Sequence, residues 1–287
     1  MKVSRLSPVK LERDPCQIFE GVKTPVALRV RMDHMGEHGC AFTAEKLAGQ
    51  ILVRQKPDHS WGTVSETVCA LFDLQLLNPG GNLITRSGVS WLLEEHLPAM
   101  ECVSTDGSPY HNLFFKVERY QSKKLNDIAG TPFSKGCSGF IKTGAALYLA
   151  SANKMHANER VAAALESLDK VIKVRKGRWC SPSCSNNILQ GYAMHPEAKD
   201  GPAMRAAVAA LGRLQKPSGV WTGAPFYPTL YALSNCESKP AAKQVRLALA
   251  KCARTQKKDG SWGGKNKLHD TYMVLEAMRR SGEVLSL

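Results

Sequence analysis

The chain has 287 residues, 43% of them hydrophobic, which is enough to bury the core of one large domain or of two small ones. Its formal net charge of +14 favours anionic partners such as phosphates or an anionic membrane surface. The basic residues form no long tract. The sequence has no zinc-finger spacing, no heptad pattern and no aromatic-rich RNA-binding signature, so we expect no specific nucleic-acid partner.

The lack of a membrane-spanning segment in the sequence and its cysteine content both bear on where the protein is expected to be found. No segment has the roughly 18 consecutive apolar residues that a spanning helix needs, and the first residues do not read as a secretory signal. The nine cysteines are therefore expected to be mostly thiols. We expect a cytoplasmic protein that could lie peripherally on a membrane.

The first 42 residues are broken by proline and glycine, and we expect an irregular N-terminal arm. Within it, residues 26–30 could form a short strand or part of a short helix. From there on, apolar periodicity and capping residues predict helices at 43–53, from 65 to the Asn-Pro-Gly-Gly at 78–81, at 88–97, 141–152, 158–174, 185–194 and 204–214, from 229, at 241–253 and from about 270. Residues 110–120 could be a strand or a short helix, and 121–139 are expected to form a long loop.

The predicted helices alternate in character along the chain. A long amphipathic helix is followed by a tight turn and then by a shorter, more apolar helix, and a helix that is apolar on most sides is buried. Pairs of this kind favour two concentric layers. We therefore expect an all-α protein, an α/α toroid of about five to six helical hairpins that forms a single domain over residues 43–287.

A short motif recurs three times at the turns between paired helices. In each copy a glutamine stands six residues before a tryptophan, and a threonine-led helix follows: Gln55 and Trp61, Gln215 and Trp221, Gln256 and Trp262. The motif resembles the QW repeat of terpenoid cyclases, which are related to the β-subunits of protein prenyltransferases. The resemblance implies the α/α-toroid fold and assigns these six residues to stability.

The resemblance also implies a function. Proteins of this superfamily act on isoprenoids, often diphosphates, in a deep apolar pocket. The resemblance therefore implies an isoprenoid-active enzyme, cyclase- or prenyltransferase-like, with an apolar and possibly diphosphate-bearing substrate in a central cavity. The alternative is a non-catalytic α/α toroid that binds a lipid or a partner.

Two acids precede the threonine of a Gln–Trp repeat, Glu66 and Asp270. Cyclases that start by protonation carry Asp-x-Asp-Asp-Thr at such a helix start, and each of these acids matches only its final Asp-Thr. Asp270 is the first candidate for a catalytic acid and Glu66 the second. The competing interpretation is that both are simple first-turn acids that cap their helices.

Aromatic side chains gather where two of the expected inner helices begin. Aromatic faces stabilise carbocations through their quadrupole. The candidates for the wall of a substrate pocket are Phe226, Tyr227, Tyr231, His269 and Tyr272. Core packing would account for the same residues.

The sequence requires no cofactor, although zinc or another soft metal is an alternative. Cys137, Cys180 and Cys184 stand near the starts of expected inner helices and are the candidate metal ligands. The zinc set of protein prenyltransferases is incomplete, because Asp270 is not followed by the Cys of their Asp-x-Cys pair. His34 to His38 matches the His-x-x-Glu-His pattern, but Gly36 opposes the helix that this pattern needs.

Overall fold

The computed structural model describes residues 11–94, 102–103, 109–110, 128, 131–134, 136 and 138–282. Its helices are η1 (Gln17–Phe19), α1 (Pro25–Asp33), α2 (Cys40–Leu52), α3 (Val64–Leu77), α4 (Leu83–Glu94), α5 (Ser138–Ala152), α6 (Glu159–Val174), α7 (Pro182–Met194), η4 (Ala198–Asp200), α8 (Pro202–Leu214), α9 (Phe226–Leu233), α10 (Lys239–Arg254) and α11 (Lys267–Ser281). Two short strands, β1 (Cys102–Val103) and β2 (Pro109–Tyr110), pair antiparallel.

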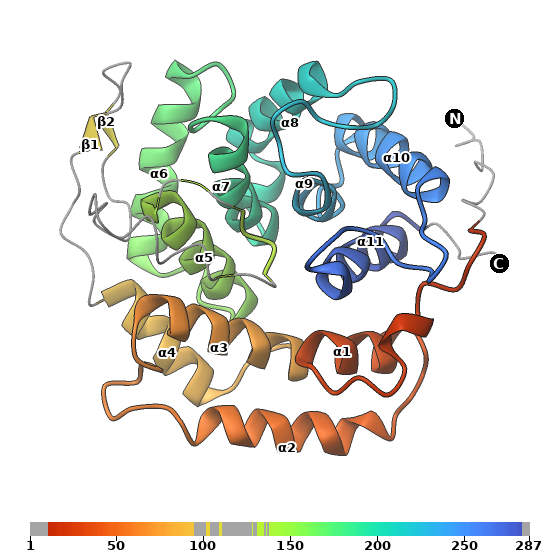
Figure 1. Cartoon of the computed structure of the whole chain (residues 1–287). Coiled ribbons are helices and arrows are strands. Elements are labelled where there is room, and N and C mark those ends of the chain that lie inside the picture. The colour runs from red at the N-terminus through yellow and green to blue at the C-terminus, as the bar shows by residue number, and fades with distance from the viewer. Residues whose placement is uncertain are drawn as a thin grey trace.

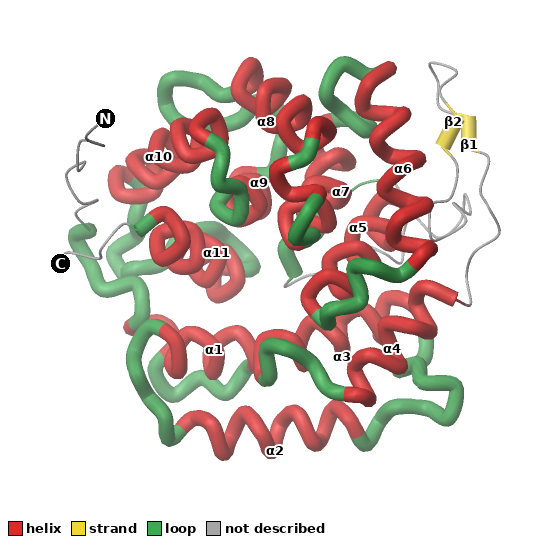
Figure 2. Tube along the Cα trace, turned by 180° about the vertical axis from the view of Figure 1, so that it is seen from behind, coloured by secondary structure: helices red, strands yellow, loops and turns green. Residues whose placement is uncertain are grey.

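The helices form two concentric layers (Figures 1 and 2). The odd-numbered helices α1, α3, α5, α7, α9 and α11 each contact the next, and α11 contacts α1, so this inner ring closes. The even-numbered helices lie outside this ring: α2, α4, α8 and α10 contact inner helices, and α6 is bonded to α7 through the Tyr192 hydroxyl, which donates to Asp169 at 2.6 Å. This arrangement confirms the all-α toroid.

Helix α1 lies inside the segment expected to be an irregular arm. Residues 26–30 are helical rather than extended, and Val26, Ala27, Leu28 and Val30 are buried. The helix contacts α2, α3 and α11, which makes it the sixth member of the inner ring. The expected irregularity is therefore wrong for residues 25–33, while the division of the chain at residue 42 stays a prediction.

The three Gln–Trp turns are held by the same hydrogen bonds. In each turn the glutamine side-chain amide donates to the carbonyl oxygen four residues later, from Gln55 to His59 at 2.9 Å, from Gln215 to Gly219 at 3.2 Å and from Gln256 to Gly260 at 2.9 Å. The same amide reaches a second carbonyl outside the turn, that of Ile84, Gln244 or Arg13. Each glutamine therefore ties its turn to a neighbouring segment.

A fourth turn of this kind occurs at Trp179 and was not predicted. Its indole N–H donates to the carbonyl of Leu168 at 3.1 Å, and its backbone N–H donates to the Ser185 hydroxyl at 3.1 Å. The indoles of Trp61 and Trp262 donate in the same way to a carbonyl of the preceding outer helix, at 2.8 Å. The residue six positions before Trp179 is a lysine, so the glutamine half of the motif is absent.

Some boundaries differ from the predicted ones. Helix α4 begins at Leu83, five residues earlier than expected, with Thr85 and Asn82 satisfying each other's backbone N–H groups at its start. Helix α9 begins at Phe226, after Pro225. Tyr110 lies in strand β2, and most of the loop expected at 121–139 falls outside the described residues. None of the described helices has the length and apolar character needed to cross a membrane.

Candidate functional site

A small cavity lies at the centre of the inner ring. It measures about 10 Å³, which is room for about one water molecule. Helices α3, α9 and α11 and the segment before α5 provide its lining: Phe72, Thr131, Pro132, Tyr231, His269, Tyr272 and Met273. Aromatic side chains therefore fill most of the centre of the toroid.

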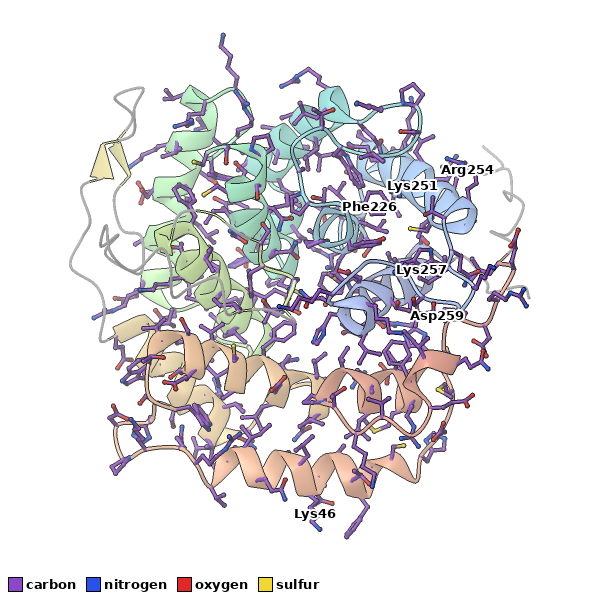
Figure 3. The ribbon with its side chains drawn as sticks, in the orientation of Figure 1. Lys46, Phe226, Lys251, Arg254, Lys257 and Asp259 are labelled. Carbon is purple, nitrogen blue, oxygen red and sulfur yellow. The ribbon has the colours of Figure 1, made fainter. Side chains whose placement is uncertain are left out.

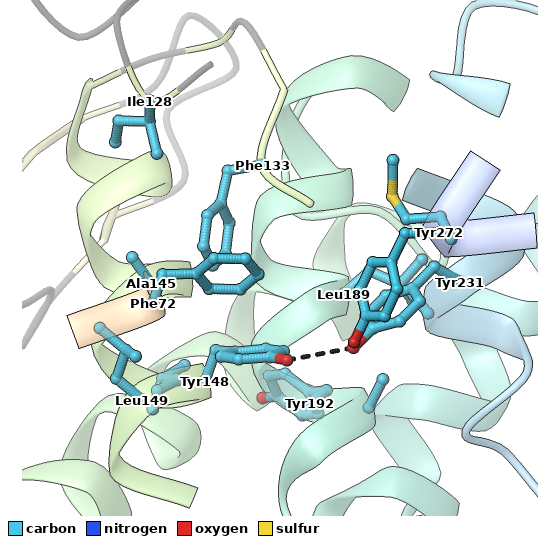
Figure 4. Packing of buried hydrophobic residues seen from close by; sticks show 14 of the residues in the cluster. Phe72, Ile128, Phe133, Ala145, Tyr148, Leu149, Leu189, Tyr192, Tyr231 and Tyr272 are labelled. Carbon is cyan, nitrogen blue, oxygen red and sulfur yellow. Dashed lines mark hydrogen bonds between the residues drawn. The ribbon is translucent and has the colours of Figure 1, made fainter. Parts of the chain in front are cut away.

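The segment 131–134 covers this cavity, and the first turns of α7 hold it in place. The Ser134 backbone N–H donates to Oδ1 of Asn187 at 2.8 Å, and Nδ2 of Asn187 donates back to the Ser134 carbonyl at 3.0 Å. Nδ2 of Asn186 donates to the Pro132 carbonyl at 3.3 Å. Phe133 stands edge-on against Tyr148, with ring centroids 5.9 Å apart (Figure 4). The cover is thus a packed part of the core.

Tyr231 and Tyr272 line the cavity, and Tyr148 contacts Tyr231. The hydroxyls of Tyr148 and Tyr231 lie 3.2 Å apart, and the rings of Tyr231 and Tyr272 are 6.1 Å apart (Figure 4). Burial raises the pKa of Tyr148 and of Tyr272 well above the usual range. These hydroxyls remain protonated, so they can act as hydrogen-bond donors inside the toroid.

His269 lines the cavity from the first turn of α11. Burial lowers the pKa of its imidazole to about 4, because the charged form would lose its hydration. At neutral pH the ring is uncharged. It can accept or donate a hydrogen bond in the cavity without bringing a charge into it.

Asp270 follows directly and faces the backbone of the turn that precedes α11. Burial raises the pKa of its carboxyl to about 6, although a backbone hydrogen bond from Gly264 and the charge of Lys257 both lower it. Tyr227 is its neighbour, and the hydroxyl of Tyr227 accepts a hydrogen bond from Gly263 N–H at 2.9 Å. Asp270 is therefore a half-buried acid at the mouth of the inner ring, beside the cavity lining but outside it.

Glu66 has a different environment. Its carboxylate accepts from the Thr63 backbone N–H at 2.7 Å, and the Thr63 hydroxyl accepts from the Glu66 N–H at 3.3 Å. These two bonds form a capping box at the start of α3. They lower the pKa of Glu66, which is exposed and ionised at neutral pH. The structure thus favours the capping interpretation for Glu66.

The predicted aromatic residues divide into two groups. Tyr231, His269 and Tyr272 line the cavity. Phe226 instead packs against Trp221 with ring centroids 5.7 Å apart, and Nζ of Lys251 lies 4.5 Å from its ring centroid (Figure 3). Tyr227, in the first turn of α9, lies between these two environments, with its hydroxyl against the turn beside Asp270.

The metal hypothesis remains a prediction. Across the described parts of the chain, no group of three or more His, Cys, Asp or Glu side chains could hold a metal ion. Cys180 and Cys184 lie at the start of α7, whereas Cys137 falls outside the described residues. The His-x-x-Glu-His pattern is spread over unrelated contacts, since His34 pairs with Glu276 at 3.1 Å and Glu37 with Arg31 at 2.6 Å.

Comparisons with known proteins support the fold. No protein-family model and no curated protein matches the sequence. Among solved structures, a protein from Actinoplanes is 18% identical with a TM-score of 0.57, and the match covers 91% of this chain and 89% of that one. The type II terpene cyclase MstE from Scytonema, in complex with geranylgeranyl dihydroxybenzoate as substrate, is 13% identical with a TM-score of 0.56 over 90% of this chain and 86% of that one. At these identities the likeness establishes a terpenoid cyclase-like fold.

Two parts of the site were not predicted from the sequence. Phe72 lines the cavity from α3, where the apolar periodicity of the sequence predicts only a buried helix face. The cover at 131–134 lies in a segment expected to be a polar loop. A usable signal was the Thr-Pro-Phe at its centre, because an aromatic side chain in a polar loop commonly packs back onto a core.

Proposed function

We propose that this protein binds an isoprenoid-like apolar molecule at the centre of its toroid. The observation that carries the proposal is the aromatic cavity formed by Phe72, Tyr231 and Tyr272 inside a terpenoid cyclase-like fold. Such a lining offers a prenyl chain dispersion contacts and removal from water, and it stabilises positive charge if one develops.

A ligand of this size requires the cover to move. The cavity of about 10 Å³ holds no prenyl unit. Its outer wall includes Thr131 and Pro132, in a non-helical segment that is attached to α7 by a few hydrogen bonds from Asn186 and Asn187. Displacing these side chains is the least costly way to admit a ligand, because the inner helices are packed against each other on both sides.

Of the two candidate functions we favour the isoprenoid-active enzyme, with Asp270 as its catalytic acid. A pKa of about 6 leaves about a tenth of the carboxyl groups protonated at pH 7. A carboxyl with a raised pKa is a weaker acid, so it suits protonation of an oxygen better than protonation of an isolated alkene. His269, neutral and one residue away, would orient the reacting oxygen or receive a proton from the product.

A diphosphate-bearing substrate would place its head at the mouth of the ring. Lys257 donates a hydrogen bond to the Gly263 carbonyl, and Lys267 pairs with Asp259 at 3.1 Å, so two cations stand at the turn before α11. The amino-terminal end of α11 adds a favourable dipole. The exposed basic residues of the α10–α11 turn, which include Arg254 (Figure 3), would also suit an anionic membrane surface.

A non-catalytic binding module is the second candidate. Glu66 is committed to its capping box, and Asp270 has no second carboxylate paired with it among the described residues. A toroid that holds a lipid or a partner without converting it would need neither acid.

Ligand binding and product analysis test the proposal and separate the candidates. The purified protein is titrated with geranylgeraniol and with geranylgeranyl diphosphate while its thermal melting is followed, and the mixtures are analysed by mass spectrometry. Binding with conversion that disappears in Asp270→Asn supports the enzyme. Binding without conversion supports the module. Absence of binding to any geranylgeranyl compound overturns the proposed function.

A further inference from the structure

The interior of the toroid contains a guanidinium group with hydrogen-bonding capacity left over. Arg280 stands in the last turn of α11, and its side chain is 19% exposed. Its Nη2 lies 3.1 Å from Oε2 of Glu276 and donates to the hydroxyl of Tyr231 at 3.2 Å. Its Nη1 is buried, and no residue in the described part of the chain accepts a hydrogen bond from it. A buried unpartnered donor of this kind is costly and calls for an explanation.

The neighbouring hydroxyls leave a second donor unused. Tyr231 accepts from Arg280 and shares one hydrogen bond with Tyr148 at 3.2 Å. One of the two phenols supplies the hydrogen of that bond. The hydrogen of the other phenol then has no acceptor in the bonds that these residues form. Burial raises the pKa of Tyr148, so its phenol keeps its proton, and the Arg280 guanidinium lies over the ring of Tyr231.

The charge balance around Arg280 is positive. Glu276 is the acid that holds it, and the same carboxylate also binds Arg279 at 2.8 Å and His34 at 3.1 Å. Two guanidinium groups therefore share one carboxylate. Asp33, the nearby acid on α1, is paired with Arg29. A single additional negative charge would be matched here, whereas another cation or a hydrogen-bond donor would be rejected.

This group adjoins the central cavity through Tyr231. The ring of Tyr231 lines the cavity, and the carbon of the Arg280 guanidinium lies 4.4 Å from the centre of that ring. Figure 4 shows the Tyr148 and Tyr231 hydroxyls meeting within the aromatic cluster. A ligand that enters past the cover at 131–134 would reach these donors with its far end.

We propose that Arg280, Tyr231 and Tyr148 form a subsite for a carboxylate carried by the ligand of the central cavity. The inference rests on the proposed function and narrows the substrate class to prenyl compounds that carry a carboxylate. A carboxylate offers acceptors only, matches one guanidinium in charge and geometry, and satisfies Nη1 together with a phenol. A diphosphate carries more negative charge than one shared guanidinium can match, so its cations are those at the mouth.

A head-group series on the full chain tests the subsite. Geranylgeranoic acid, geranylgeraniol and geranylgeranyl diphosphate share one prenyl chain, and calorimetry gives their dissociation constants. We expect the acid to bind at least about tenfold more tightly than the alcohol, as for a hydrogen-bonded charge in a desolvated site. Arg280→Gln should remove that preference. Arg279→Gln is the matched control, because Arg279 binds the same Glu276 with a half-exposed side chain, and it should keep the preference.

The other outcomes of this experiment decide whether the carboxylate subsite exists. Equal binding of acid and alcohol by the wild-type protein overturns the subsite while leaving the proposed function intact, and failure of all three compounds to bind overturns both. A preference that survives Arg280→Gln also overturns it. Should Arg280→Gln fail to fold, Tyr148→Phe serves instead, since it removes one donor and leaves the ion pairs untouched. It should reduce the preference several-fold, and an unchanged preference counts against the subsite.

Discussion

Glu66 and Asp270 occupy the same place in two inner helices, yet their environments differ. Each directly precedes a threonine whose Oγ1 accepts a hydrogen bond from a tryptophan backbone N–H, at 3.0 Å for Thr67 and 3.1 Å for Thr271. The pKa of Glu66 is lowered by hydrogen bonds from Thr63, whereas burial raises that of Asp270 to about 6. Ionised Glu66 therefore stabilises the start of its helix, whereas ionisation of Asp270 destabilises the folded protein.

This contrast predicts opposite effects of neutral isosteres. Above pH 6 the Asp270 carboxylate is held in a folded state that disfavours it, so Asp270→Asn should stabilise the protein at pH 8 by about 1 kcal/mol after allowance for partial exposure. At pH 3 the effect should vanish, because the carboxyl is then protonated in both the folded and the unfolded state. Urea denaturation at both pH values provides the measurement.

Glu66→Gln is the matched control for this experiment. Because the folded-state pKa of Glu66 is lowered, its contribution is present at neutral pH and is lost as the pH falls through that value, so the substitution should lower stability at pH 8. An Asp270→Asn protein that is less stable than the wild type at pH 8 would show that Asp270 is also a cap. A substitution that removes a charge and stabilises the protein is instead typical of a residue retained for function.

The pH dependence near His269 should have the opposite sign to that of Asp270. The folded-state pKa of His269 is about 4, below its usual value of 6.5, so the unfolded chain binds more protons between these values. Because burial disfavours the protonated ring, the stability should fall by up to about 3 kcal/mol as the pH falls from 6.5 towards 4. His269→Gln should flatten the stability profile in this range. Replacement of the exposed His38 should leave the profile unchanged, and an equal response of both variants would contradict the assignment.

Much of the architecture could be predicted from the sequence, because helix periodicity and the Gln–Trp spacing are local signals. The membership of α1 in the inner ring could not, since the charged Arg29 and Arg31 mask its apolar face and only the contacts with α3 and α11 reveal it. The cover at 131–134 was equally hidden. It depends on side chains of α7 more than 50 residues away, and no local pattern encodes such a pairing. Among the residues of the candidate site, His269, Tyr231 and Tyr272 could be predicted. Local sequence signals indicate where the helices that carry them begin.

The fourth tryptophan turn should be as important for stability as the predicted ones. Trp179 is 1% exposed, as is Trp262, and each indole donates to a carbonyl of the preceding outer helix. Trp179→Phe keeps most of the apolar volume and leaves that carbonyl without its partner, so we expect a loss of about 1–2 kcal/mol in the free energy of unfolding. Trp262→Phe should cost a similar amount in the same urea titration. A negligible effect at position 179 with a large one at 262 would show that the glutamine is needed for the indole to matter.

Metal analysis bears on the cysteine hypothesis. Cys180 and Cys184 could supply two ligands at the start of α7, and a closed zinc site takes four. We expect the purified protein to contain less than about a tenth of an equivalent of zinc by elemental analysis. Near-stoichiometric zinc that falls in Cys137→Ser would establish the three-thiol site instead.

Truncating the cover should open the central cavity. Phe133 is 8% exposed and packs edge-on against Tyr148, so Phe133→Ala should destabilise the protein by about 3 kcal/mol. An apolar space opened in this way binds small apolar molecules, so the variant should gain affinity for a short prenyl alcohol such as geraniol, seen as a larger ligand-induced rise in melting temperature than the wild type shows. Phe19→Ala is the control, because Phe19 is fully buried in η1 and belongs neither to the cover at 131–134 nor to the cavity lining. It should lose stability without gaining affinity. An equal ligand-induced rise in melting temperature in the two variants would show that Phe133 does not restrict access to the cavity.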